Sequence, residues 1–356
     1  MYLNFERLKG LGAIFIMIVA FSAFSFNFSD VKRMIGFGKK DGQADVVEMV
    51  QAEIVAPSSA ILYPDRMKRM KQFLHDDNQL DVSMPSDLYR KSNPYSSNTE
   101  KYRYNHLLQS IHSPTIQMIW ALRGGYGSQD ILPYLLKRSA PLSEKKYVGY
   151  SDSTLLLLFF NQRWGWRPIH GMMSIEVNEL GSGKKDKENY EYLKQIVTAK
   201  EDFTLTYSNI LRPLNDLARN KPQISGTITG GNLTMLVSSI GTDWEVETDG
   251  KILIIEEVRE KMHRIDRALN HLGLVGKLDK LEALVIGDLS KDPNQVDFWD
   301  ELFDFTIQRL SERYQIPIYK TEVFGHGKVN YPFMVGAKGT IDGKDLHQAI
   351  VVVGKE

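Results

Sequence analysis

The feature that most constrains the fold of this chain is a pair of consecutive segments that each predict strand, tight turn and helix. Residues 116–122 have the apolar density of a parallel strand buried on both faces, and the glycine-rich segment 123–135 leads from them into a helix. Residues 145–160 repeat the pattern, with the turn Gly149-Tyr150-Ser151-Asp152 before an apolar run. Two such units predict an α/β domain whose loops gather at the carboxyl edge of a parallel sheet.

The second turn makes Ser151 a candidate nucleophile. Strand, sharp turn and helix expose a serine hydroxyl and aim backbone N–H groups at the same point. The G-x-S-x-G motif is incomplete, because Ser153 occupies its last glycine position. The local sequence alone favours an N-cap for the following helix as the role of Ser151 and Asp152. A nucleophilic serine also needs a base and a group that orients the base, so the hypothesis depends on residues elsewhere in the chain.

Two histidines and two glutamates are the candidates for these partners. Among the eight histidines, His326 follows a predicted strand and is flanked by glycines, which would present the ring at a domain edge. His170 is the alternative base and could equally line the pocket. Glu256 and Glu257 end an apolar strand, where an unpaired carboxylate is costly, so each needs a partner. A salt bridge to a nearby arginine is the alternative to a catalytic role for either glutamate.

Composition excludes several classes of chemistry. The chain has 356 residues, which favours two domains, and no cysteine, which rules out thiolate catalysis, cysteine-bound zinc and disulfides. Lys+Arg and Asp+Glu are equal at 44 each, so net charge gives no support for a nucleic-acid partner. The motif HExxH is absent, and the turn at 123–127 lacks the P-loop Lys-Ser/Thr. We therefore expect neither a metal nor a cofactor.

Residues 1–30 are expected to form a signal peptide or a membrane anchor. The run 11–26 contains only two polar residues, both serines, and follows Arg7 and Lys9. Basic residues also follow the run, so the topology signal is mixed. We expect an exported or membrane-anchored protein of the cell envelope, with an anchor facing the cytoplasm as the alternative. A buried core helix is the structural alternative to both.

The rest of the chain divides into a linker, two domains and a connecting segment. The predicted boundaries are 31–46 for the linker, 47–180 for the N-terminal α/β domain with Ser151, 181–223 for the connecting segment and 224–356 for the C-terminal domain. The connecting segment is charged and low in aliphatic residues, with one expected helix. The C-terminal domain contains two buried strands, an amphipathic helix between them and a closing hairpin around Asp342-Gly343.

Taken together, these motifs resemble the LD-carboxypeptidase family of serine peptidases, which includes the microcin C immunity hydrolases. The resemblance extends over roughly residues 47–340. It is carried, in the order typical of the family, by IVAPSS (54–59), ALRGGYG (121–127), GYSDST (149–154), His170-Gly171, GGNLTML (230–236), IIEEVREKMHRIDRAL (254–269) and VFGHG (323–327).

The resemblance implies a fold and a set of site residues. The expected fold is an N-terminal Rossmann-like parallel-sheet domain and a C-terminal mixed α/β domain of β-barrel-like, swivelling character, assembled as a homodimer. The implied triad is Ser151 as nucleophile, His326 as general base and Glu256 as the orienting acid. Glu257 remains an alternative, because the family commonly has Glu-Asp at this pair. The implied oxyanion hole consists of the backbone N–H groups of Gly125 and Asp152.

The resemblance also implies a reaction. The expected activity is release of the terminal D-alanine from murein tetrapeptides through an acyl-enzyme, with Arg123, His170 and Asn232 as candidate substrate-binding residues. One alternative is hydrolysis of aminoacyl-nucleotide amides, as in the microcin-immunity branch. Another is a membrane-tethered binding protein without catalysis, which the presence of all three triad residues disfavours.

Overall fold

The computed structural model describes residues 49–88, 94–291 and 298–352. The predicted signal or anchor segment at 1–30 and the linker at 31–46 lie outside these ranges, so both stay predictions. In the part of the chain that the structure describes, no helix has the length and apolar character needed to cross a membrane.

The first domain contains a six-stranded sheet in the order β12-β5-β4-β3-β1-β2. Its parallel strands are β1 (Val50–Val55), β2 (Leu80–Ser83), β3 (Met118–Ala121), β4 (Lys146–Gly149) and β5 (Ile169–His170). The sixth strand, β12 (Phe333–Met334), comes from near the C-terminus and pairs antiparallel with β5. The two predicted strand–turn–helix units are therefore present as β3 with α5 (Ser128–Leu135) and β4 with α6 (Thr154–Trp164).

The second domain contains an eight-stranded mixed sheet in the order β6-β14-β13-β8-β9-β10-β11-β7. The central strands β8 (Gln223–Asn232), β9 (Lys251–Glu260), β10 (Ala283–Lys291) and β11 (Ile318–Lys320) are parallel. The hairpin of β13 (Lys338–Asp342) and β14 (Asp345–Ile350) lies where the closing hairpin is predicted, and β13 runs antiparallel to β8. The predicted sequence of a parallel-sheet domain and a mixed-sheet domain is confirmed.

The connecting segment contributes both edges of the second sheet. It contains α7 (Glu188–Val197), β6 (Phe203–Tyr207), β7 (Arg212–Pro213) and α8 (Asp216–Asn220). β6 pairs with β14 and β7 with β11, and the two strands stand at opposite ends of the sheet order. Within the described residues the second sheet is therefore open. This differs from the barrel-like character that the resemblance implies. An edge strand has one exposed side, which explains why this polar segment carries little aliphatic signal.

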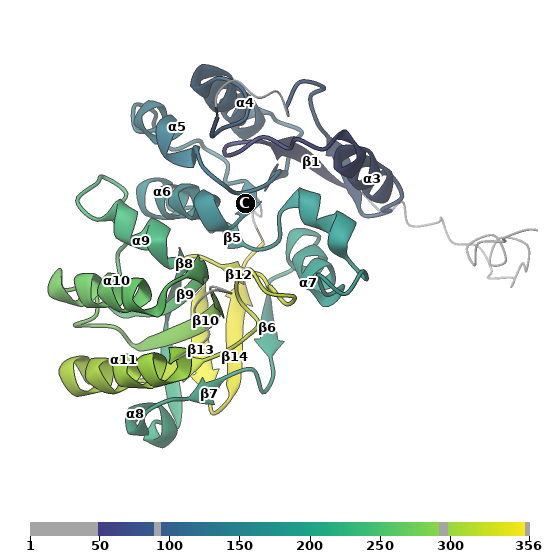
Figure 1. Cartoon of the computed structure of the whole chain (residues 1–356). Helices are drawn as coiled ribbons and strands as arrows, with labels where there is room; N and C mark the ends of the chain where they lie inside the picture. Colours follow the sequence, from purple (N-terminus) through teal and green to yellow (C-terminus); the bar gives the residue numbers. More distant parts are fainter. Residues whose placement is uncertain (1–48, 89–93, 292–297, 353–356) are drawn as a thin grey trace, which may run out of the picture. The chain divides into compact units, whose positions relative to one another are not determined.

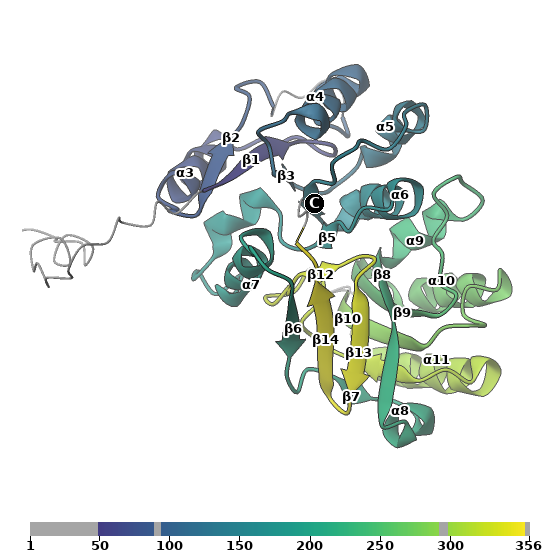
Figure 2. The same ribbon diagram turned by 180° about the vertical axis from the view of Figure 1, so that it is seen from behind.

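One row of helices crosses both domains (Figures 1 and 2). It comprises α4 (Glu100–His112), α5, α6, α9 (Leu233–Ser239), α10 (Met262–Leu274) and α11 (Trp299–Tyr314), each in contact with the next. α6 lies at the junction, between the first domain's strands and both α9 and β8 of the second domain. This position explains the unbroken apolar run 155–160, because every side chain in it is buried. The same packing fixes the start of α6, and with it Ser151, between the domains.

Candidate active site

Ser151 occupies a strained turn between β4 and α6. Its φ of 59° is left-handed, which is uncommon for a residue with a side chain and typically costs about 1–3 kcal/mol. The neighbouring turn after β3 leaves room for it, since a Cβ on Gly124 would lie 2.9 Å from both the Cβ and the Oγ of Ser151. A strained serine between a strand and a helix is the geometry of a nucleophile elbow.

The side chain of Asp152 ties three loops together beneath Ser151. Its Oδ2 accepts hydrogen bonds from the Ser58 hydroxyl (2.5 Å) and the Ser128 backbone N–H (2.9 Å). The Ser128 hydroxyl donates in turn to the Asp152 carbonyl at 2.6 Å. The loop after β1, the start of α5 and the Ser151 turn are thereby held in register. The carboxylate of Asp152 therefore anchors neighbouring loops, a role that differs from both the predicted N-cap and the predicted backbone donor.

The glycine turn after β3 requires glycine at Gly125 for two reasons. Its φ is 116°, and a Cβ there would lie 2.2 Å from the Ser59 hydroxyl oxygen. Ser59 Oγ accepts the Tyr126 backbone N–H at 3.0 Å and donates to the Tyr95 carbonyl at 2.6 Å. Gly125 lines the same cavity as Ser151, so the turn borders the space in which a substrate carbonyl would react.

Glu256 and His326 form a direct buried contact. The Oε2 of Glu256, on β9, lies 2.6 Å from the Nδ1 of His326, in the loop after β11. With Nδ1 engaged by the carboxylate, Nε2 is the ring nitrogen left to exchange a proton with another group. Burial alone would raise the pKa of Glu256, but the charge of His326, the adjacent His170 and the hydrogen bond to His326 together lower that pKa to about 2. Burial lowers the pKa of His326, and the charge and hydrogen bond of Glu256 outweigh this and raise it.

Glu257 has a different set of partners. Its carboxylate accepts hydrogen bonds from the Asn232 side-chain amide (3.0 Å), the backbone N–H of Thr234 (2.9 Å) and of Val258 (2.9 Å), and the Thr234 hydroxyl (2.6 Å). These contacts fasten the start of α9 to β9. Asn232 also caps α9 by accepting from the Met235 N–H at 3.2 Å. Neither Glu257 nor Asn232 lines the cavity that contains Ser151.

His170 lies behind the Glu256 carboxylate, away from the cavity lining. It is fully buried, its ring stacks on Phe333 with centroids 4.4 Å apart, and burial lowers its pKa. Its Nε2 is 4.0 Å from Glu256 Oε1, too far for a hydrogen bond. Within the described chain neither ring nitrogen of His170 has a hydrogen-bond partner, and neither does Glu256 Oε1.

Ser151 and His326 line one cavity of about 230 Å³ although they come from different domains. Two arginines and two glutamates also line it: Arg66, Arg123, Glu176 and Glu179. Arg66 pairs with Glu179 at 2.8 Å. The guanidinium of Arg123 donates to the carbonyls of Ala60 (3.1 Å) and Gly124 (3.2 Å) and forms no ion pair with the described part of the chain. Burial and the neighbouring charge of Arg66 lower the pKa of Arg123.

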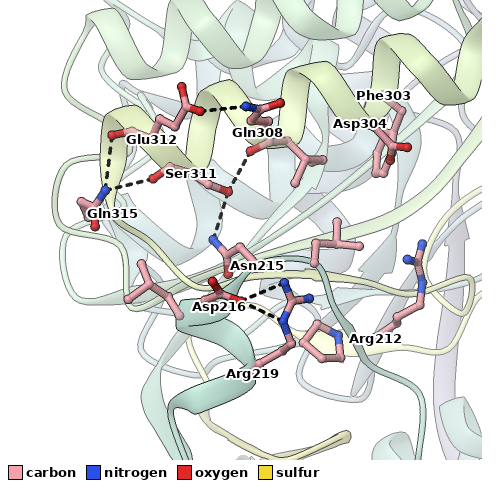
Figure 3. A pocket seen from close by; sticks show the side chains of 14 residues that line it. Arg212, Asn215, Asp216, Arg219, Phe303, Asp304, Gln308, Ser311, Glu312 and Gln315 are labelled. Atoms are coloured by element: carbon pink, nitrogen blue, oxygen red, sulfur yellow. Dashed lines mark hydrogen bonds and ion pairs between the residues drawn. The ribbon is translucent and has the colours of Figure 1, made fainter.

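A larger cavity of about 580 Å³ lies between α8 and α11 (Figure 3). Its polar side chains are satisfied mainly by one another. Asn215 donates to the Ser311 hydroxyl at 3.1 Å, Arg219 pairs with Asp216 at 3.0 Å, and Gln308 donates to Glu312 at 2.9 Å. None of the predicted site residues lines this cavity. Size alone therefore does not identify the reactive site.

Three residues near the predicted site, Tyr150, Glu176 and Lys185, were not predicted from the sequence. The Tyr150 hydroxyl donates to Glu176 Oε1 at 2.7 Å, and the same oxygen lies 3.0 Å from Lys185 Nζ. Lys185 belongs to a run of charged residues that is indistinguishable in sequence from a solvated loop, yet it is buried. The only sequence signal for any of the three was the position of Tyr150 directly before Ser151. In the described ranges no group of three or more His, Asp or Glu side chains is arranged to hold a metal ion.

Comparison with protein families gives one match for each domain. Residues 52–171 match the LD-carboxypeptidase N-terminal domain, and residues 225–341 match the LD-carboxypeptidase C-terminal domain. The two matched regions contain Ser151, Glu256 and His326 and leave the connecting segment between them.

The chain is also similar to individual proteins with carboxypeptidase names and to one solved structure. A relative from Rickettsia conorii, whose name assigns it provisionally to the carboxypeptidases, is 36% identical over 269 residues, covering 75% of this chain and 82% of the relative. The murein tetrapeptide carboxypeptidase of Pseudomonas aeruginosa is 28% identical over 262 residues, covering 71% and 81%. The structure of MccF in complex with glutamyl sulfamoyl guanosine matches with a TM-score of 0.71 at 21% identity, covering 85% of this chain and 97% of MccF. At that identity the match with MccF demonstrates a shared fold.

Proposed function

The chain belongs to the LD-carboxypeptidase family, a family of serine hydrolases, and on that premise we propose that it hydrolyses an L,D-amide bond to release D-alanine from murein tetrapeptides. The observation that carries the proposal is that one cavity is lined both by Ser151, from the strained turn of one domain, and by His326, which Glu256 holds in the other. The name of the Pseudomonas relative supports murein tetrapeptide as the substrate.

In the proposed mechanism Ser151 Oγ attacks the carbonyl carbon of the scissile amide while His326 Nε2 accepts the hydroxyl proton. Glu256 holds the tautomer with the proton on Nδ1 and stabilises the imidazolium. The imidazolium then protonates the leaving nitrogen, and D-alanine departs from the acyl-enzyme. His326 next takes a proton from water, whose oxygen attacks the ester, and the returned proton restores Ser151.

We propose that the backbone N–H groups of Gly125 and Asp152 stabilise the developing oxyanion by donating hydrogen bonds to it. The two turns that carry them are fixed by Ser59 and by the Asp152 carboxylate, so the donors need no rearrangement during the reaction. Each preorganised donor of this kind typically lowers the barrier by about 3–4 kcal/mol. Arg123 is the proposed partner of the substrate's terminal carboxylate, because it lines the cavity and has no carboxylate partner in the described chain.

The test uses the purified full-length protein and two substrates. We expect it to release D-alanine from a murein tetrapeptide faster than it cleaves an aminoacyl-nucleotide amide, the substrate class of the alternative microcin-immunity type. Ser151→Ala should abolish the release. Ser153→Ala is the matched control, because Ser153 belongs to the same turn but does not line the cavity, and it should retain activity. Undiminished release by Ser151→Ala would refute the mechanism, and preference for the nucleotide would move the enzyme to the alternative class.

A further inference from the structure

Tyr150, Glu176 and Lys185 form a buried cluster beside the base, and Glu176 also lines the cavity. The side chains of Glu176 and Lys185 are 9% and 6% exposed, and their charged atoms are 3.0 Å apart. Lys185 Nζ also donates to the carbonyl of Gly327 at 2.9 Å and approaches that of His326 at 3.4 Å. The ammonium group therefore holds the main chain of the loop that presents the base.

The same cluster reaches the turn of the nucleophile. Tyr150, the residue before Ser151, donates its hydroxyl to Glu176 Oε1 at 2.7 Å. Its ring lies against the His326 ring, with centroids 4.8 Å apart, and the Lys185 ammonium lies 5.8 Å from the Tyr150 ring centroid. One hydrogen-bonded group thus contacts both catalytic loops, which come from different domains.

Stability alone is a weak explanation for this cluster. A buried ion pair loses much of its Coulombic gain to desolvation, and apolar side chains of similar volume often stabilise a protein as well or better. Glu176 is also fixed independently of Lys185, because its second oxygen accepts the Met173 backbone N–H at 2.8 Å. The carboxylate therefore has a defined position relative to the imidazole.

We propose that Glu176 and Lys185, linked through Tyr150, are positioning residues that hold the His326 loop and set the basicity of the His326 imidazole. The inference rests on the proposed function, in which His326 is the general base. The negative charge of Glu176 favours the imidazolium and the positive charge of Lys185 disfavours it, so the pair balances two opposite effects. Each charge influences the pKa of His326 in the expected direction: Glu176 raises it and Lys185 lowers it. Among the neighbouring charges, that of the nearer Glu256 has the largest influence.

Other titratable groups also face the loop that carries His326, and any test must leave these residues unsubstituted. The titratable groups near His326 in the described chain, besides the pair itself, include Glu256, His170, Tyr150 and Asp288. Three further charged groups line the same cavity: Arg66, Arg123 and Glu179. Asp288 lies beneath the flanking glycines, since a Cβ on Gly327 would be 3.1 Å from its Oδ2, and it accepts a hydrogen bond from Ser290 at 2.7 Å. Substitution of Glu176 or Lys185 leaves these residues themselves in place, but replacing Glu176 changes the hydrogen-bond acceptor of Tyr150, which is part of the cluster.

The experiment measures the titration of His326 directly in the full-length protein. Histidine is isotopically labelled, its ring signals are followed by NMR from pH 5 to 9, and the His326 signal is assigned by its loss in His326→Gln. We expect Glu176→Gln to lower the titration midpoint and Lys185→Met to raise it, each by about 0.3–1 pH unit, the range expected for charges within several ångströms at a partly screened site. The acid limb of kcat/KM should move with the midpoint. Glu144→Gln, which alters a partly buried carboxylate paired with Arg167 outside the cavity, should leave the midpoint unchanged.

The outcomes separate this inference from the proposed function. Shifts of the two variants in the same direction, or no shift in either, would overturn the inference even if D-alanine release is normal. Opposite shifts in a protein that releases no D-alanine would support the cluster's effect on His326 and refute the proposed reaction instead. If Lys185→Met fails to fold, the double variant Glu176→Met/Lys185→Met, which leaves no unpaired charge, provides the second measurement. It should return the midpoint to within about 0.3 pH unit of the wild type, and a larger displacement would contradict the proposed balance.

Discussion

The adjacent residues Glu256 and Glu257 allow a sharp test, because the structure gives them separate tasks. Glu257 accepts four hydrogen bonds, two on each oxygen. Replacement by Gln turns one oxygen into a donor group, so at least one buried N–H loses its acceptor. That loss, together with the loss of the charge, should destabilise the protein by about 2–3 kcal/mol. Activity per folded molecule should fall by less than tenfold, because Glu257 does not contact His326.

Glu256 should differ from Glu257 in its effect on activity. Only its Oε2 has a hydrogen-bond partner in the described chain, so Gln can keep that bond by directing its oxygen at His326. Because the pair with His326 stabilises the charged form of Glu256, loss of the charge should also lower the unfolding free energy, so the two variants are separated by their activity. Loss of the charge and of tautomer control should reduce kcat/KM by about 10²–10⁴-fold.

The assay pairs urea unfolding with D-alanine release for both variants at one pH. If Glu256→Gln retains activity while Glu257→Gln loses it, the two roles are reversed and the assignment of Glu256 as orienting acid is refuted. Equal losses of activity in both variants would contradict the separation of catalysis from the capping of α9.

Three further perturbations address the cavity and the first sheet. Gly124→Ala should displace Ser151 and reduce kcat by about 10²-fold with little change in Tm, and an unchanged kcat would contradict the close approach of the two turns. Arg123→Met should raise KM at least tenfold while kcat changes less, which steady-state kinetics would reveal; an unaltered KM would exclude Arg123 as the carboxylate partner. Burial raises the pKa of Glu53, but its hydrogen bonds with His106 (2.8 Å) and Ser83, together with the charge of His106, lower it below the ordinary 4.5. The folded state therefore binds fewer protons, so this contribution to stability is complete above about pH 4.5 and is lost as the pH falls through the folded pKa. Urea unfolding at pH 6 and pH 4 should show a smaller loss for His106→Asn than for the wild type, and equal losses would refute the coupling.

Local sequence predicts most of the fold because the central elements carry strong periodic or apolar signals. The segment 116–122 contains β3, and β9 and β10 are the two buried strands predicted in the C-terminal domain, since buried parallel strands demand continuous apolar residues. Three strands were not predicted: the edge strands β6 and β7, and the two-residue strand β12. All three strands are short, and β6 and β7 bury at most one face. Pairing partners distant in sequence therefore define these strands rather than their own composition.

The candidate site divides in the same way. Ser151, Glu256 and His326 could be singled out because turn glycines and strand ends leave a local signature. The choice of Glu256 over Glu257 as the partner of His326 depends on the alternation of side chains along β9. Successive residues of a strand point to opposite faces, so one carboxylate meets His326 and the next meets the start of α9. Register of this kind comes from the pairing of β9 with β8 and β10.

The sequence by itself determined the α/β class, the two-domain order and the strained serine turn, because each depends on residues close together in the chain. Tertiary structure alone decided that Lys185 is a buried cation beneath the His326 loop and that Asp152 joins three loops through its carboxylate. A lysine in a charged segment has the same local signature whether water or a protein interior surrounds it. What distinguishes the two cases is the set of carbonyl and carboxylate oxygens that folding brings to it, and those oxygens belong to residues up to 142 positions away.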